Sequence, residues 1–210
     1  MCVAARPMLE LDGVSRNFGD RAVLGNLTAL VARGERVALV GPNGSGKTTA
    51  LRCVAGTLLP TRGHVTVDGH EAGSLAARRL IGASLAQERS FYLRLTGRSN
   101  LLFFARLRHG NERAADRDVS ELVQELELDE IVPERVDRCS SGMIQQLAFA
   151  RALLGRPSLL LLDEPTRSLD RDARRRVWDA IERRSQTAVL IATHLDEDLE
   201  RCGTRIDFPT

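Results

Sequence analysis

Aromatic residues and closely spaced cysteines are scarce in this sequence. Aromatics make up 4% of the 210 residues, with one tryptophan (Trp178) and one tyrosine (Tyr92), so a platform for stacking nucleic-acid bases is not expected. The four cysteines include no C-x-x-C pair. This spacing argues against a metal site or a disulfide framework, and reduced thiols fit the cytosol.

The sequence also lacks a long apolar run and a strong net charge. No apolar stretch approaches the ~18 residues needed to cross a bilayer, and residues 1–16 lack the apolar centre of a signal peptide. The formal net charge is +2, too small to indicate nucleic acid or an anionic membrane as a partner. We therefore expect a cytoplasmic protein that is long enough to form one domain with its own core.

Lysine is almost absent: Lys47 is the only one, and the rest of the 30 Lys and Arg residues are arginine. Lys47 lies in GPNGSGKT at residues 41–48, which fits the phosphate-loop pattern G-x-x-x-x-G-K-[ST]. An ammonium group is a compact point charge that reaches between nucleotide phosphates, and a planar guanidinium does not simply replace it. The retained lysine indicates a chemical role; the alternative is compositional bias and chance.

The residues around this motif predict the strand, turn and helix that a phosphate loop requires. Residues 37–40 form a short apolar run that predicts a buried strand. Gly44 and Gly46 allow the backbone to bend and bring its N–H groups toward an anion. The helix that opens at Thr48 would present its N-terminus to phosphate. This pattern predicts nucleotide binding but does not identify the reaction.

Strand and helix patterns alternate along the rest of the chain and favour a parallel α/β sheet. Apolar runs and turn residues predict strands at 9–18, 29–31, 64–67, 159–162 and 187–193, the last of them being the final strand. We expect a single domain over residues 1–210. Its core would be formed by about 1–88 and 155–210, and about 89–154 would be an inserted helical subdomain.

Two acids end the apolar run 159–162, at the carboxyl end of a strand where open α/β sheets bind ligands. In a phosphate-loop enzyme Asp163 would help to hold Mg²⁺ together with the hydroxyl of Thr48. Glu164 would accept a proton from the attacking water. The alternative for Glu164 is a solvated loop acid, but the fixed turn at Pro165 favours the base role.

Together the motifs resemble the nucleotide-binding domain of the ATP-binding cassette (ABC) family, over about residues 9–205. Their order is GPNGSGKT at 41–48, Gln87, CSSGM at 139–143, LLLLDEPT at 159–166, SLD at 168–170 and His194. Kinases and GTPases share the phosphate loop but not the signature stretch before the acid pair. The resemblance implies a phosphate-loop NTPase core with a mostly parallel sheet, an N-terminal antiparallel β subdomain and an inserted helical subdomain.

The resemblance also implies roles for matching residues, with ATP and Mg²⁺ as cofactors. Phe18 would stack on adenine, and Glu164 would be the catalytic base. Gln87 would contact Mg²⁺ or the attacking water, and His194 would contact the γ-phosphate. The residues that would cradle the phosphates are Gly41, Pro42, Asn43, Gly44, Ser45, Gly46, Lys47, Thr48 and Thr49.

A second copy of the domain is implied as a partner. Ser140 and Gly142 resemble the signature serine and glycine, which in this family reach the ATP held by another nucleotide-binding domain. Asp170 matches the aspartate that links the two sites. The expected working unit is a head-to-tail dimer with two ATP molecules in its interface, which closes on ATP binding and opens after hydrolysis.

The signature departs from the LSGGQ of most family members. Its Ser-Ser-Gly-Met form resembles the exporter branch that handles drugs, haem, lipids or polysaccharides. Cys139 replaces the usual leucine or tyrosine, Gln146 the usual arginine, and Arg167 a usual small residue. These changes leave turnover rate and dimer contacts open.

The first function hypothesis is the ATPase subunit of an ABC exporter, peripheral on the inner membrane face through a separate permease. The permease would dock near residues 87–95, where Phe91, Tyr92 and Leu93 form an apolar patch or pack the helical subdomain. The alternatives are a soluble ABC ATPase outside transport and a poorly hydrolysing regulator. The arginine clusters at 174–176 and 183–184 are interpreted as a solvated helix face, so no nucleic acid is expected.

Overall fold

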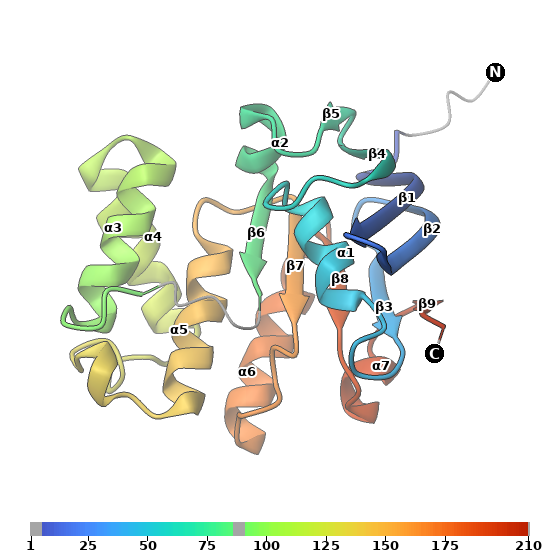
Figure 1. The fold of residues 1–210 in the computed structure, drawn as a ribbon. Helices are drawn as coiled ribbons and strands as arrows, with labels where there is room; N and C mark the ends of the chain where they lie inside the picture. Colours follow the sequence, from blue (N-terminus) through green and yellow to red (C-terminus); the bar gives the residue numbers. More distant parts are fainter. Residues whose placement is uncertain (1–5, 86–90, 210) are drawn as a thin grey trace.

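The N-terminal part of the chain folds as an antiparallel sheet (Figure 1). The computed structural model describes residues 6–85 and 91–209. The strand order of this sheet is β2-β1-β4-β5. Its strands are β1 (Leu9–Phe18), β2 (Arg21–Val31), β4 (Arg62–Val67) and β5 (His70–Glu71). Strand β2 begins eight residues before the predicted strand at 29–31, because it forms a long hairpin with β1 through the turn at Gly19 and Asp20.

The second sheet carries the predicted parallel core. Its order is β6-β7-β8-β3-β9, and every pairing in it is parallel. The strands are β3 (Arg36–Val40), β6 (Ile81–Ser84), β7 (Leu159–Asp163), β8 (Ala188–Ala192) and β9 (Thr204–Asp207). All residues of β7 and β8 are buried, as in parallel sheets covered on both faces. The predicted fold class is therefore confirmed.

The prediction that the final strand lies at 187–193 is wrong. Strand β9 follows β8 in the sequence and pairs with β3, where Ala38 faces Arg205 and Leu39 faces Ile206. In β9 only Ile206 is apolar, and three of its four residues are exposed. An edge strand of this kind lacks the apolar run that identifies a buried strand.

Helices cover the parallel sheet on both faces (Figure 1). They are α1 (Lys47–Val54), α2 (Leu75–Leu80), α3 (Gly97–His109), α4 (Glu112–Glu125), α5 (Ser141–Leu153), α6 (Arg171–Glu182) and α7 (Asp196–Glu200), with a 3₁₀ turn η1 (Val136–Arg138). Helices α3, α4 and α5 stand together beyond the β6 edge of the sheet. No helix among residues 6–85 and 91–209 is long and apolar enough to cross a membrane.

The four leucines of β7 divide between two hydrophobic cores. Leu160 and Leu162 belong to the core shared with helices α3 to α6. Leu159 and Leu161 belong to the core shared with α1 and the antiparallel sheet. This alternation follows from the pleat of a strand, which points successive side chains to opposite faces. The sheet is thereby fixed between two layers, and its carboxyl ends are held at one edge.

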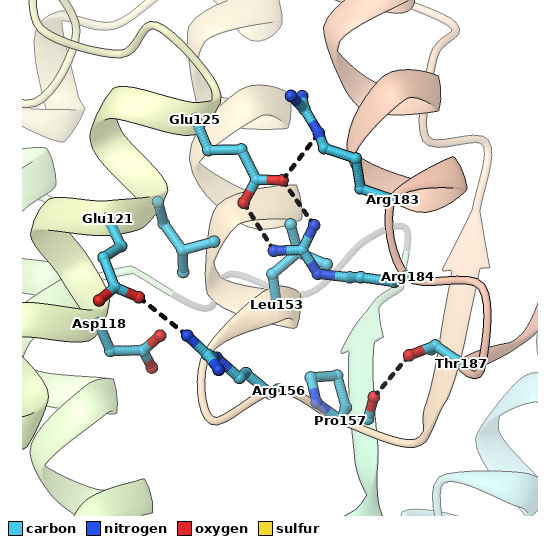
Figure 2. A pocket seen from close by; sticks show the side chains of 10 residues that line it. Asp118, Glu121, Glu125, Leu153, Arg156, Pro157, Arg183, Arg184 and Thr187 are labelled. Carbon is cyan, nitrogen blue, oxygen red and sulfur yellow. Dashed lines mark hydrogen bonds and ion pairs between the residues drawn. The ribbon is translucent and has the colours of Figure 1, made fainter.

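The arginine clusters of α6 are only partly a solvated face, contrary to the sequence interpretation. Arg184 donates two hydrogen bonds of 2.7 Å to the carboxylate of Glu125 on α4, and its side chain is 19% exposed. Arg183 lies 3.4 Å from the same carboxylate, and Arg156 pairs with Glu121 (Figure 2). These arginines therefore join α6 and the loop after α5 to the acidic side of α4.

We expect Glu125→Gln to lower the free energy of unfolding by about 1–2 kcal/mol, because a mostly buried bidentate ion pair is lost. Hydrogen bonding to Arg184 holds the pKa of Glu125 below its usual range, so the pair stabilises the folded state above the ordinary glutamate pKa. This contribution disappears as the pH falls through the lowered pKa. Urea unfolding of both proteins between pH 7 and pH 3 measures the difference.

The control is Glu112→Gln, which removes an exposed pair with Arg106 at the start of α4. Exposed pairs contribute about 0–1 kcal/mol, so this change is expected to have little effect. Equal losses in the two variants, or a Glu125 effect that does not depend on pH, would contradict the buried pair as the source.

Candidate active site

The phosphate-loop motif forms the turn between β3 and α1. Gly46, directly before α1, has φ 102°, a left-handed conformation that L side chains rarely adopt. A Cβ on Gly46 would lie 2.4 Å from the carbonyl oxygen of Val23. The loop therefore packs tightly against β2, and glycine is required at this position.

Lys47 is held inside this loop. Lys47 is only 8% exposed. Its ammonium donates to the carbonyl oxygens of Gly41 at 2.6 Å and Pro42 at 2.8 Å. The hydroxyl of Ser45 is buried and has no hydrogen-bond partner among the described residues. A buried, unpaired hydroxyl in the same loop as a buried lysine fits a site that receives an anionic ligand.

The N-terminus of α1 is open toward this loop. Within the described residues no side chain caps the helix at Gly46, so the N–H groups of its first turn lack intrahelical partners. These N–H groups and the positive end of the helix dipole favour a bound phosphate. The predicted residues of 41–49 thus lie around one cradle.

Thr48 and Asp163 meet at the floor of the site, although they are 115 residues apart. The Thr48 hydroxyl donates to Oδ2 of Asp163 at 2.7 Å, and Asp163 is 6% exposed. A hydroxyl and a carboxylate oxygen beside a phosphate cradle are the hard oxygen donors that Mg²⁺ takes. These residues fit the predicted metal ion.

Glu164 and His194 form a second pair, from the loops after β7 and β8. Oε1 of Glu164 lies 2.6 Å from Nδ1 of His194, and Oε2 is buried without a partner among the described residues. Burial raises the pKa of Glu164, the neighbouring His194 opposes this, and Asp163 raises it further. The free oxygen gives this carboxylate capacity to accept a proton or a hydrogen bond.

The backbone of Glu164 is strained. Its φ is 49°, in the left-handed region that a non-glycine residue seldom occupies. Its N–H donates to the carbonyl of Ala192 on β8 at 2.8 Å. Strain of this kind concentrates where a functional side chain must be aimed.

The signature residues lie at the start of α5. Ser140 is the N-cap residue and accepts from the N–H of Met143 at 3.2 Å. A Cβ on Gly142 would lie 2.8 Å from the carbonyl of Ser168, so the helix start packs closely on the loop before α6. Asp170 is the N-cap residue of α6, and its side chain accepts from the N–H of Ala173 at 2.8 Å.

Figure 1 shows that these site elements open toward one side of the molecule, the lower side of the view. On that side lie the first residues of α1 and α5 and the carboxyl ends of β6, β7 and β8.

Phe18 and Gln87 complete the predicted set. Phe18 ends β1 and is 48% exposed. The Arg16 guanidinium lies 4.6 Å from the centroid of its ring, a contact that the sequence analysis missed. Spacing of two along a strand could have indicated it, because such residues share a face. Gln87 lies outside the described residues.

The glycine loop, the uncapped helix and the acid pair at the strand end define a phosphate-loop nucleotide-binding protein. Comparison with known proteins narrows this class. The family model described as ABC transporter matches residues 24–167. The chain belongs to the ABC transporter family, as the order of its motifs predicted, and has the fold of its ATP-binding cassettes.

Individual relatives agree with this assignment. The ABC transporter ATP-binding protein YdbJ of Bacillus subtilis is 37% identical over 207 residues, which cover 96% of this chain and 66% of that protein. The Nod factor export ATP-binding protein I of Rhizobium sp. (strain N33) is 36% identical over 203 residues, covering 94% of this chain and 66% of that protein. This chain thus spans just under two thirds of both relatives.

A solved structure of a dimeric bacterial ABC transporter cassette is similar over nearly its full length. It superposes with a TM-score of 0.86 at 25% identity, over 96% of this chain and 94% of that one.

Proposed function

We propose that this chain is the ATP-hydrolysing subunit of an ABC exporter. The observation that carries the ATPase part is the assembly of two pairs at one sheet edge, Thr48 with Asp163 and Glu164 with His194. Lys47 and the backbone N–H groups of Gly41 and residues 43–49 bind the phosphates, and the exposed ring of Phe18 offers a face to the adenine.

In this proposal Glu164 accepts the proton of the attacking water through Oε2, whose hydrogen-bonding capacity is free. His194 orients the Glu164 carboxylate and contacts the γ-phosphate. Thr48, Asp163 and Gln87 would hold Mg²⁺, which when bound neutralises phosphate charge. Lys47 moves its hydrogen bonds from the carbonyls of Gly41 and Pro42 to phosphate oxygens.

The proposed working unit is a head-to-tail homodimer. Ser140 is exposed and Gly142 half-buried at the start of α5, so both remain available to a nucleotide on a second copy. Asp170 is exposed at the loop before α6. The dimeric state of the similar bacterial cassette supports this arrangement.

Export is supported by similarity to the Nod factor export ATP-binding protein and by the Ser-Ser-Gly-Met signature. A separate permease would hold the chain at the inner face of the membrane.

Residues 1–210 would act as one ATPase domain, in which the helical part at about 89–154 moves against the core. The ion pairs of Arg176 with Glu127, just after α4, and of Arg184 with Glu125 on α4 leave fewer free arginines for nucleic acid.

The decisive experiment is to tag the chain in its native cell, solubilise the membranes in mild detergent and identify the proteins that co-purify. A stoichiometric multi-span membrane protein is expected. A soluble complex or ribosomes without a membrane protein would overturn the export part and leave the ATPase part standing.

The permease is proposed to dock on the exposed side of the segment 91–95. Phe91 is half-buried and packs edge-on against Phe104 with centroids 6.3 Å apart, so it belongs to the helical core. Tyr92 and Leu93 are 51% and 55% exposed, and Tyr92 packs edge-on against Phe103 with ring centroids 5.0 Å apart. The exposed members form the apolar patch that a partner would cover.

We expect the double variant Tyr92→Ala/Leu93→Ala to lower recovery of the membrane partner by about tenfold, as loss of a buried aromatic anchor does. ATP binding should be unchanged, because the patch is separate from the phosphate loop. The control is Leu30→Ala, an apolar residue on β2 that is 64% exposed. Full recovery with the double variant, or equal loss with Leu30→Ala, would remove this docking site.

A further inference from the structure

A buried carboxylate behind the active site joins three separate elements. Asp198 on α7 is 1% exposed. Its Oδ2 accepts hydrogen bonds from the hydroxyls of Thr166 at 2.6 Å and Thr193 at 2.9 Å. Its Oδ1 accepts from the indole N–H of Trp178 at 2.8 Å. All three donors are buried, so the four side chains satisfy one another away from water.

Two of these donors lie beside the Glu164–His194 pair in the chain. Thr193 directly precedes His194, and its hydroxyl also accepts from the N–H of Leu195 at 3.2 Å. His194 is therefore flanked by Thr193, which donates to the Asp198 carboxylate, and by Leu195, whose N–H donates to the Thr193 hydroxyl. Thr166 stands two residues after Glu164, in the same loop.

The strained backbone of Glu164 needs support from both directions. A non-glycine residue stays at φ 49° only where its surroundings over-determine it. On one side, the N–H of Glu164 is fixed by Ala192 on β8. On the other side, the anchor is the bond from Thr166 to Asp198.

We propose that Asp198 is a positioning residue for ATP hydrolysis. By fixing Thr166 and Thr193 it keeps the carboxylate of Glu164 and the ring of His194 in contact at 2.6 Å. Asp198 itself touches neither nucleotide nor water in this role. The inference rests on the roles of Glu164 and His194 given under the proposed function.

The third donor supplies a built-in reporter of this network. Trp178 is the only tryptophan of the chain, is 2% exposed and lies on α6, the helix that Asp170 caps. Its indole N–H donates to Asp198 and its ring lies 5.5 Å from the Arg201 guanidinium, so its fluorescence reports the surroundings of Asp198 together with this contact. A change at Thr166 or Thr193 that releases Asp198 is expected to shift this emission.

The test compares two variants that remove bonds to the same carboxylate. Asp198→Ala is expected to lower kcat for ATP by about 10- to 100-fold with KM within about threefold, because a small misplacement of reacting groups is costly. Trp178→Phe removes only the bond toward α6 and is expected to keep kcat within about twofold. Melting temperatures of both variants show whether folded protein is lost.

The single-hydroxyl variants Thr166→Val and Thr193→Val keep side-chain shape and decide the matter if Asp198→Ala does not fold. Each is expected to lower kcat by about fivefold or more and to shift the Trp178 emission. Unchanged kcat in both would overturn the proposal, as would an equal loss of kcat in Trp178→Phe.

Glu164→Gln is measured alongside. Turnover at the wild-type rate in Glu164→Gln would overturn the assigned base and the positioning role with it. Normal turnover in Asp198→Ala with slow turnover in Glu164→Gln would overturn the positioning role alone.

Discussion

Replacing Glu164 with glutamine is expected to slow ATP turnover by about 10²- to 10⁴-fold, the range contributed by a positioned general base. The amide keeps the length and shape of the side chain. Its oxygen can still face Nδ1 of His194, which in the wild type lies 2.6 Å from the Glu164 carboxylate. It accepts no proton from water. ATP affinity is expected to stay within a few-fold of the wild type, because Glu164 makes no part of the phosphate cradle.

Steady-state phosphate release and equilibrium nucleotide binding measure the two quantities separately. The variant should also accumulate the ATP-bound dimer, which size-exclusion chromatography detects. The matched control is Glu130→Gln, the same change at an exposed glutamate that follows α4. A Glu164→Gln protein that turns over ATP within about threefold of the wild type would contradict the assigned base.

The second large effect concerns Lys47. Lys47→Ala is expected to weaken ATP binding by about 10- to 100-fold, since hydrogen bonds to charged groups contribute about 1.5–3 kcal/mol each. Lys47→Arg should fail almost as badly, although the charge is kept. The ammonium occupies a narrow position between the carbonyls of Gly41 and Pro42, where a planar guanidinium is too wide.

Fluorescent-nucleotide titration measures these affinities, and circular dichroism confirms that the variants remain folded. Arg52→Ala, near the end of the same helix, removes a positive charge outside the cradle and should bind ATP normally. Wild-type affinity in Lys47→Arg would show that charge alone, and not the shape of the lysine, is needed.

Much of the site could be predicted because its signals are local. The apolar runs at 37–40 and 159–162 predicted β3 and β7, because strands buried on both faces of a parallel sheet consist almost entirely of apolar residues. The start of α6 is also a local feature, because the Asp170 side chain accepts from the N–H of Ala173 three residues further on. The order of the motifs from residue 41 to residue 194 predicted the family, and the match to the family model confirmed it.

Other features depend on pairings between distant residues, which the sequence does not display. Strand β9 carries one apolar side chain and exists through its partner β3. Arg184 finds Glu125 59 residues away, and Thr166 finds Asp198 32 residues away. Each of these polar residues alone is typical of a solvated surface, so only the folded structure distinguishes it.

The ion pairs between α4 and its neighbours differ in their sensitivity to ionic strength. The pair Arg156–Glu121 is exposed at both ends, so dissolved ions screen it. The Glu125–Arg184 pair is mostly buried and resists screening. Salt is therefore expected to weaken the Arg156–Glu121 pair and to leave the Glu125–Arg184 pair intact, so the link between α4 and the end of α6 persists at high ionic strength.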